Sequence, residues 1–316
     1  MTTKEERYAE EHARLVFRTL CLPGPDGALG APLSETWEVS GVLGMGGEAT
    51  VLHLTPHASD FVTPPPVALK VLNEKMNGRP LSRQRLRLEA ERLKHCNGPH
   101  IVRCEGLACN VNDEPGLLLE LVNPDGKTLT QRGIENANCV DLARKVMWFT
   151  MCVNALGSLH RHQIAHRDVK SHNFCVSPDG RAVKLIDLTM STYEHSEDAD
   201  LLCGTEHYWP PDRKEEGCSP LHADLFALCL VFSEILLGRI HELGVQRWPG
   251  VVPALDASLR GTLEKAIWRM HGDLGRLFLP KSLIAFVRRG TMPTQADRFQ
   301  SIEQLKAALE WATLNL

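Results

Sequence analysis

Hydrophobic side chains follow two different patterns along this chain of 316 residues. Between residues 37 and 122 they fall in short runs separated by glycine, proline and other turn-forming residues, which is typical of β-strands. After residue 139 the apolar positions recur over longer stretches at helical spacing. The predicted strands are 36–44, 50–55, 67–72 and 116–122, with two short strand-like pieces at 174–177 and 182–187.

Two helices are predicted ahead of the helical part of the chain. Residues 3–20 form the first, and residues 81–96 form the second with Ser82 as its N-cap, because a hydroxyl there can accept a hydrogen bond from the first turn. The apolar face expected for the first helix consists of Tyr8, Leu15 and Thr19.

This switch from strands to helices predicts an α+β fold with two lobes. Residues 37–122 would form a small β-rich lobe with one main helix, and residues 123–316 a larger helical lobe. Residues 1–36 would be an N-terminal extension. The joint between the lobes is expected near residues 122–127, where the last strand of the small lobe runs into the turn-forming sequence NPDG.

Composition narrows the class of protein. Acidic and basic residues are interspersed and the net charge is −4, which excludes the basic face of a general nucleic-acid binder. Ten irregularly spaced cysteines without a CxxC pair indicate reduced thiols rather than a zinc site. No secretory leader is recognisable, and the longest apolar run, Leu225–Phe232, is too short to span a bilayer. We therefore expect a cytoplasmic protein with no nucleic-acid partner and no membrane span.

A glycine-rich turn, GMGGEATV at Gly44–Val51, lies between two predicted strands. Glycines let backbone amides approach phosphate oxygens closely, because no Cβ intervenes. Taken alone, the turn is better interpreted as an ordinary hairpin turn. A dinucleotide-binding fingerprint is disfavoured, because it requires a helix after the glycines.

Lys70 and Glu89 are two charged residues on otherwise apolar elements. Lys70 lies in the strand VALKVL, on the same face as Ala68 and Leu72. Glu89 shares the apolar stripe of the helix over 81–96, at helical spacing from Leu86, Ala90 and Leu93. A buried carboxylate requires a cation, so the two side chains are candidates for an ion pair. On these two residues alone, solvation of both side chains is the favoured interpretation.

The stretch HRDVKSHN, from His166 to Asn173, gathers polar residues directly after an apolar helical segment. Asp187 follows at the end of the strand-like piece KLID. An aspartate and an asparagine supply the oxygen ligands that suit Mg²⁺. Asp168 could then accept a proton from an attacking hydroxyl, and Lys170 could neutralise a transferring phosphoryl group.

In this order, these elements resemble a eukaryotic-type Ser/Thr protein kinase, over residues 37–312. The resemblance implies a two-lobed kinase fold and transfer of the γ-phosphate of ATP to Ser or Thr of a protein substrate, with Mg²⁺ or Mn²⁺ as metal. Lys170 and Thr205 resemble Ser/Thr rather than tyrosine kinases, and Gly204–Asp212 resembles the end of an activation segment. The implied catalytic residues are Asp168, Lys170, Lys70 and Glu89, and the implied metal ligands are Asn173 and Asp187.

The same resemblance implies a nucleotide site. Backbone atoms of Glu120 and Val122 would bond to the adenine, with Leu119 as gatekeeper and Cys175 in the floor of the pocket. It also implies an ion pair between Asp212 and Arg298. The implied nucleotide-binding residues are Leu43, Gly44, Gly46, Val51, Ala68, Lys70, Leu119, Glu120, Val122, Asn173 and Cys175.

Two departures from the family pattern bear on activity. Ala49 replaces the third glycine of the turn, and Asp187 is followed by Leu188 and Thr189 where the family has Phe and Gly. Threonine is stiffer than glycine and can restrict movement of this segment.

The main alternative to an active enzyme is a pseudokinase scaffold that binds nucleotide weakly. A small-molecule phosphotransferase is disfavoured by the peptide-docking segment. The sequence predicts neither the protein substrate nor the oligomeric state.

Some polar residues have two interpretations. Asp224 is an N-cap of the apolar helix that follows, or, as the family resemblance suggests, it holds the backbone of the catalytic loop. Arg167 pairs with Asp200, or the acidic stretch around Asp200 is simply solvated. We expect surface roles for three histidines, His160, His162 and His172.

Overall fold

The computed structural model describes residues 4–24, 28–57, 63–131, 140–196, 203–213, 219–238, 257–277 and 279–314. The chain divides into two compact units. The first consists of Met1–Lys127 with the short segments Ser177–Asp179 and Asp187–Thr189; the second consists of Thr128–Val176, Gly180–Ile186 and Met190–Leu316.

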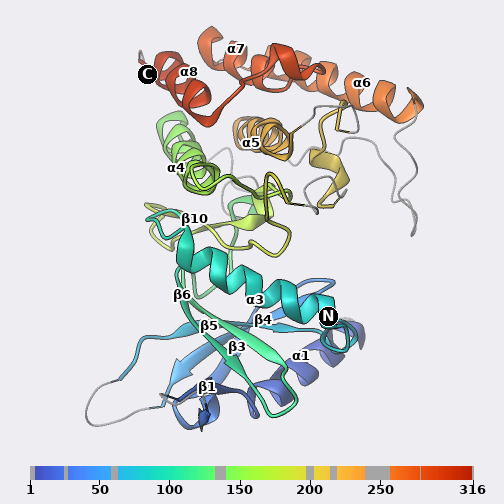
Figure 1. Cartoon of the computed structure of the whole chain (residues 1–316). Coiled ribbons are helices and arrows are strands. Elements are labelled where there is room, and N and C mark those ends of the chain that lie inside the picture. The colour runs from blue at the N-terminus through green and yellow to red at the C-terminus, as the bar shows by residue number, and fades with distance from the viewer. Residues whose placement is uncertain are drawn as a thin grey trace. The chain divides into compact units, whose positions relative to one another are not determined.

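The first unit is built on a seven-stranded antiparallel sheet in the order β2-β1-β6-β7-β5-β4-β3 (Figure 1). The strand–turn–strand and the two buried strands predicted from the sequence are confirmed. The strands are β1 Cys21–Pro23, β2 Leu29–Pro32, β3 Trp37–Met45, β4 Ala49–Pro56, β5 Val67–Leu72, β6 Cys104–Cys109 and β7 Pro115–Glu120. The helices are α1 Lys4–Phe17, α2 Glu74–Asn77 and α3 Pro80–His95.

Helix α1 is part of the core of this unit. Ala13, Val16 and Phe17 are buried in one hydrophobic cluster with sheet residues that include Leu54 and Leu69. The helix predicted over residues 3–20 is therefore confirmed, but its predicted apolar face is wrong. Tyr8 and Leu15 on that face are 57% and 63% exposed. The buried residues Ala13, Val16 and Phe17 follow each other at i, i+3 and i+4, so this apolar stripe packs on the sheet and the face with Tyr8 and Leu15 does not.

Helix α3 begins earlier than predicted. Its N-cap is Arg79 and Pro80 occupies the first turn, so the assignment of Ser82 as N-cap is wrong. Proline suits the first helical position, because its fixed φ is already helical and no N–H there needs a partner. The apolar stripe was predicted correctly: Leu86, Glu89, Ala90 and Leu93 are all buried.

The second unit is mainly helical, and α5 forms its centre. Helix α5 contacts α4, α6 and α7, and the rings of Phe149 and Phe232 stack at 4.0 Å between centroids. Together the two units form an α+β fold, as predicted. The helices are α4 Leu142–His160, α5 Pro220–Leu237, α6 Ala257–Leu274, α7 Lys281–Gly290 and α8 Ile302–Thr313. The short strands pair as β8 Ile164–Ala165 with β11 Thr192–Tyr193 and as β9 Phe174–Val176 with β10 Val183–Leu185.

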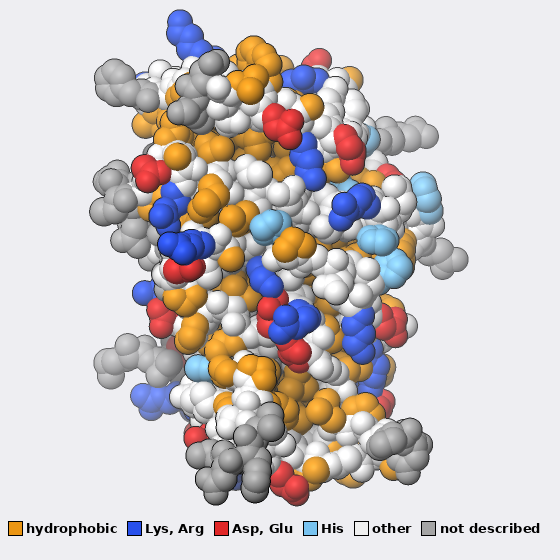
Figure 2. Space-filling view, turned by 90° about the vertical axis from the view of Figure 1, so that its left-hand side faces the viewer, with side chains coloured by type: hydrophobic (Ala, Val, Ile, Leu, Met, Phe, Trp, Pro, Cys, Tyr) orange, Lys and Arg blue, Asp and Glu red, His pale blue; other side chains and the backbone are white. Residues whose placement is uncertain are grey.

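By length and composition, α5 could cross a membrane, and it is the one such helix in the part of the chain that the structure describes. However, 83% of it is buried inside the protein, which is the environment of a core helix. On the face shown in Figure 2, acidic and basic side chains are interspersed over both units.

The expected ion pair between Asp212 and Arg298 is confirmed. The guanidinium of Arg298 donates to the Asp212 carboxylate at 2.6 Å, and both side chains are buried. The guanidinium also stacks on the ring of Phe226, with its carbon 4.9 Å from the ring centroid. This pair ties the segment after Tyr208 to the loop before α8.

Replacing Phe17 with alanine should destabilise the first unit. A buried aromatic side chain would be lost from the core between α1 and the sheet, at a cost of about 3–5 kcal/mol in the free energy of unfolding. Leu15→Ala on the exposed face of the same helix is the matched control, with an expected change within about 0.5 kcal/mol. Chemical denaturation measures both, and equal effects would contradict the packing of α1 described above.

His271 on α6 should make stability depend on pH. The hydroxyl of Thr291 donates its proton to Val287 at 2.8 Å, so Nε2 of His271, 2.7 Å away, must be the donor to that hydroxyl. Burial, followed by the charge of Arg288, lowers the pKa of His271 to about 4. The unfolded chain binds this proton near pH 6.5 (about its reference value), whereas the folded protein binds it only near pH 4.

Stability should therefore fall as the pH drops from about 6.5 towards 4, and His271→Gln should reduce this dependence. The measurement is the midpoint of urea unfolding at several pH values. His195→Gln, at an exposed histidine, is the control and should leave the dependence unchanged. An identical pH dependence in His271→Gln and the wild type would show that His271 is not its source.

Candidate active site

The glycine-rich turn joins β3 to β4 and is open to solvent. The amide of Gly46 donates to the carbonyl of Ala49 at 2.9 Å. A Cβ at Gly44 or Gly47 would meet no atom within 4 Å, and one at Gly46 would touch only that carbonyl, at 3.6 Å. The fold itself therefore does not require glycine at these positions, which leaves the backbone accessible to a ligand.

Asn73, which sequence analysis missed, anchors this turn. Its side-chain amide donates to the carbonyl of Gly46 at 2.8 Å and accepts from the hydroxyl of Thr50 at 2.9 Å, while its backbone amide donates to Glu48 at 2.9 Å. Asn73 directly follows β5, so one residue connects the strand of Lys70 to the glycine-rich turn.

Several residues predicted to bind nucleotide share one face of the sheet. Val51 pairs with Lys70 across β4 and β5, and Ala68 pairs with Leu119 across β5 and β7. Directly opposed residues of antiparallel strands project to the same side. The sheet thus brings these four residues together as expected, with Ala68 and Leu119 buried.

The other residues predicted for the adenine site lie at the ends of the same strands. Leu43 belongs to β3, Glu120 ends β7, and Val122 is half-buried just beyond it. The amide of Glu120 donates to the carbonyl of Arg103 at 3.0 Å. Gly126 has φ +65°, and a Cβ there would collide with the carbonyl of Leu43. Only glycine allows this close approach, a requirement that sequence analysis missed.

Lys70, Glu89 and Asp187 form an ionic cluster in which Lys70 and Glu89 are buried and Asp187 is partly exposed. Nζ of Lys70 donates to both oxygens of Glu89, at 3.0 and 2.9 Å, and to Oδ1 of Asp187 at 2.9 Å. The predicted ion pair of Lys70 and Glu89 is therefore confirmed, and the alternative that both are solvated is wrong. Glu89 is fully buried, where an unpaired carboxylate would be very unfavourable.

Charge contacts keep Lys70 and Asp187 ionised. Burial alone would lower the pKa of Lys70, but the carboxylates of Asp187 and Glu89 raise it well above its ordinary value. Burial would likewise raise the pKa of Asp187, but Lys70 and the hydroxyl and amide of Thr189 hold it well below its ordinary value. Asp187 is therefore a carboxylate at neutral pH, as a metal ligand must be.

In the second unit, Asp168 is held by three neighbours. Its Oδ1 accepts from the hydroxyl of Thr205 at 2.7 Å, and its Oδ2 accepts from Nζ of Lys170 at 2.7 Å. Nζ of Lys170 also donates to the Thr205 hydroxyl at 3.0 Å. The side-chain amide of Asn173 donates to the carbonyl of Asp168 at 2.8 Å and to Oδ2 at 3.2 Å. Three residues selected from the sequence thus converge on the carboxylate of Asp168.

The backbone before Asp168 is bent, and Asp224 holds the bend. Arg167 has φ +66°, a left-handed conformation that is uncommon outside glycine. The carboxylate of Asp224 accepts from the amides of His166, at 2.6 Å, and Arg167, at 2.8 Å. Two charge-assisted hydrogen bonds offset the unfavourable conformation. Of the two interpretations of Asp224, support of this loop is therefore confirmed.

The N-cap interpretation of Asp224 is wrong, because Ser219 caps α5. The surface role expected for His160 is also wrong. His160 is buried, and its Nε2 lies 3.1 Å from the Asp224 carboxylate. His162 and His172 are exposed, as expected.

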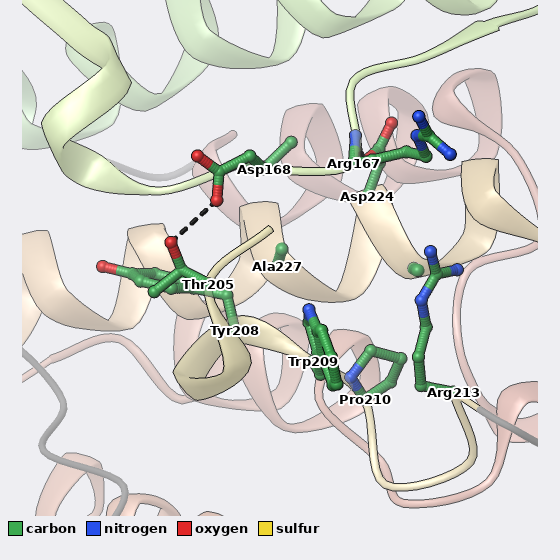
Figure 3. Close-up of a pocket in the computed structure, with 11 residues that line it drawn as sticks. Arg167, Asp168, Thr205, Tyr208, Trp209, Pro210, Arg213, Asp224 and Ala227 are labelled. Atoms are coloured by element: carbon green, nitrogen blue, oxygen red, sulfur yellow. Dashed lines mark hydrogen bonds between the residues drawn. The ribbon is translucent and has the colours of Figure 1, made fainter. Parts of the chain in front are cut away.

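Gly204 allows the segment that carries Thr205 to reach the loop of Asp168. It has φ +93°, and a Cβ there would collide with the carbonyl of Arg167. Figure 3 shows the hydroxyl of Thr205 joined to Asp168 by a hydrogen bond, and both residues line one pocket together with Tyr208 and Trp209.

A buried chain of hydrogen bonds holds Tyr208, one of the residues that line this pocket, in place. The hydroxyl of Tyr208 donates to the carboxylate of Glu234 on α5 at 2.9 Å and lies 3.3 Å from the hydroxyl of Ser171. Thr130 donates to Ser171 at 2.8 Å. Burial and the charge of Glu234 raise the pKa of Tyr208, so the phenol stays protonated. Glu234 was not selected from the sequence, although a glutamate inside so apolar a helix indicates a buried partner.

Residues 37–243 match the protein kinase domain. The chain belongs to the protein kinase domain family.

The sequence identity to individual relatives in this family is low. Aurora kinase A-B of Xenopus laevis is 28% identical over 225 residues, which is 70% of this chain and 52% of the relative. Serine/threonine-protein kinase PrkC of Bacillus subtilis is 28% identical over 291 residues, 90% of this chain and 41% of the relative. Serine/threonine-protein kinase PknE of Mycobacterium tuberculosis is 26% identical over 270 residues, which is 84% of this chain and 44% of the relative. The chain thus spans about half the length of these relatives, or less.

Within this kinase domain, Leu188 and Thr189, which replace the family's Phe and Gly after Asp187, make several contacts. Leu188 is fully buried, as expected for the apolar position. The hydroxyl of Thr189 lies within hydrogen-bonding distance of Lys70, Glu89 and Asp187. Residue Asp200, proposed as a partner of Arg167, lies outside the described residues; Nε of Arg167 donates to the carbonyl of Met190 at 2.7 Å.

Cys175 is buried in β9, opposite Lys184 of β10. Among the described residues there is no group of three or more His, Cys, Asp or Glu side chains that could hold a metal ion by themselves.

Replacing Asn73 with alanine should loosen the glycine-rich turn of this kinase domain. Loss of the side-chain hydrogen bonds to Gly46 and Thr50 should speed amide hydrogen exchange within residues 44–50 about 5- to 10-fold, since each such bond contributes about 1 kcal/mol. Asn112→Ala, in an exposed turn of the same unit, is the control. Hydrogen exchange with mass spectrometry measures the effect, and unchanged exchange would show that the strands alone hold the turn.

Proposed function

We propose that this chain is a serine/threonine protein kinase that transfers the γ-phosphate of Mg-ATP to Ser or Thr hydroxyls of a protein substrate. The observation that carries this proposal is the arrangement around Asp168. A carboxylate held in place by Lys170, Thr205 and Asn173 can orient a hydroxyl group and accept its proton. Membership of the protein kinase family supports the same conclusion, as do the serine/threonine-protein kinases among its relatives.

The first unit is proposed to bind the nucleotide. Lys70 carries a positive charge on the same face of the sheet as Val51, Ala68 and Leu119, so a phosphate and an apolar base could both be accommodated there. Accessible amides of the glycine-rich turn suit phosphate oxygens. Leu43, Glu120 and Val122 would border the base, and Glu89 would keep Lys70 in place. The proposed nucleotide ligands are completed by Gly44, Gly46, Asn173 and Cys175.

Asp187 and Asn173 are proposed as the protein ligands of the metal. Asp187 is ionised, and its Oδ2 has none of the hydrogen bonds that hold Oδ1. Mg²⁺, or Mn²⁺ in its place, would neutralise phosphate charge when bound. Asp168 would orient the substrate hydroxyl and accept its proton, while Lys170 would stabilise the negative charge of the transferring group.

The alternative is a pseudokinase that acts as a scaffold. It would be favoured if a group required for chemistry were missing or misdirected. Instead, Lys70 and Glu89 are paired, Asp187 is ionised, and Asp168 is held by its neighbours. These observations support the active enzyme. Free thiols at all the cysteines that the structure describes support our proposal of a cytoplasmic location.

Asp168→Asn should lower turnover at least 100-fold while nucleotide affinity changes less than threefold, because a general base acts in the transition state and not in binding. Lys70→Met and Asp187→Ala should abolish transfer. The measurement is phosphate incorporation from labelled ATP into a generic protein substrate. Asp113→Asn, at an exposed aspartate in the first unit, is the matched control and should retain full activity. Equal incorporation by the wild type and Asp168→Asn would refute the enzyme and favour the scaffold.

A further inference from the structure

Thr189 occupies a position where a side-chain hydroxyl meets all three members of the ionic cluster. Nζ of Lys70 donates to this hydroxyl at 2.7 Å. The hydroxyl in turn lies 2.6 Å from Oδ1 of Asp187 and 2.9 Å from Oε2 of Glu89. The glycine that the kinase family has at this position offers no atom that could make these contacts.

The Thr189 hydroxyl belongs to a hydrogen-bond network supplied by the three N–H groups of Lys70 and its own O–H. An ammonium group has three N–H donors, but Lys70 has four acceptors within 3.0 Å, namely both oxygens of Glu89, Oδ1 of Asp187 and the Thr189 hydroxyl. The cluster also contains two carboxylates and one cation. The hydroxyl takes one N–H from the ammonium and gives its own proton to a carboxylate, so it adds a link to the network without leaving a carboxylate oxygen short of a donor.

The backbone of the same segment is bound to the cluster as well. The amide of Leu188 donates to Oε1 of Glu89 at 3.1 Å, and the amide of Thr189 donates to Oδ1 of Asp187 at 2.9 Å. Glu89 is fully buried on α3, so the segment Asp187–Thr189 is attached to this helix through a side chain that has no access to solvent. The Thr189 hydroxyl adds a second connection between the segment and α3.

We propose that Thr189 is a positioning residue that latches Asp187 to the Lys70–Glu89 pair and so keeps these residues assembled without a bound ligand. This inference deepens the proposed function, because Asp187 is the proposed metal ligand. A phosphate oxygen that binds Lys70 must displace one of its four acceptors. If that acceptor is Asp187, the hydroxyl and amide of Thr189 still hold Oδ1, whereas a glycine would leave the amide alone.

The test compares Thr189→Val, which keeps the branched shape but lacks the hydroxyl, with Thr189→Ser, which keeps the hydroxyl. In the ligand-free protein, exchange of the Leu188 amide should be at least 10-fold faster in Thr189→Val and unchanged in Thr189→Ser. Thr192→Val is the matched control: this threonine is also buried, but its hydroxyl bonds to Ser196, so exchange at Leu188 should not change. NMR-detected hydrogen exchange gives the rates.

A second measurement links the latch to activity. At saturating ATP, the Mg²⁺ concentration for half-maximal phosphate transfer should rise about 10-fold in Thr189→Val, with little change in the maximal rate, and should stay near the wild-type value in Thr189→Ser. Unchanged exchange in Thr189→Val, or equal acceleration in Thr189→Ser, would overturn the latch. Faster exchange limited to Thr189→Val in a protein that transfers no phosphate would uphold the latch and refute the proposed kinase activity.

Discussion

Burial of charge at Lys70 and Glu89 is the constraint on which the first unit depends. A charged side chain inside a protein is tolerated only when it is paired and hydrogen-bonded. Lys70 reaches from the central part of the sheet, Glu89 from the buried stripe of α3, and Asp187 from a segment more than a hundred residues away. Satisfying these charges therefore determines where the helix and the distant segment lie against the sheet.

The second unit uses buried acids in a similar way. Helix α5 is apolar along almost its whole length, yet Asp224 and Glu234 are buried on it. Each meets donors from a loop: Asp224 accepts from the bent backbone of Arg167, and Glu234 accepts from Tyr208. A rigid core helix thus positions both the loop of Asp168 and the segment of Thr205. The unfavourable backbone conformation of Arg167 persists because the hydrogen bonds to Asp224 stabilise the loop in that position.

Helix caps and helix faces show where local sequence patterns were insufficient. Ser82 is a good cap by residue type, but Pro80 suits the first turn better, so the helix starts before it. The exposed Tyr8 and Leu15 show that apolar type alone does not select the buried face, which follows the helical spacing of Ala13, Val16 and Phe17. His160 was expected at the surface, because no local pattern reveals that Asp224, 64 residues away, lies beside it.

The sequence by itself determined the class of fold, the strands around the glycine-rich turn, the apolar stripe that carries Glu89, and the set of chemical residues. The fold class, the strands and the stripe follow from side-chain periodicity and residue type over neighbouring positions, whereas the set of chemical residues follows from their order along the chain and its resemblance to protein kinases. Only the tertiary structure decided the partners of Asn73, Asp224 and Thr189. Thr189 and Glu89 are 100 residues apart. A hydrogen bond between them forms only if the donor–acceptor distance is correct to within a few tenths of an ångström. The packing of sheet, helix and segment sets such distances, and no stretch of sequence encodes them locally.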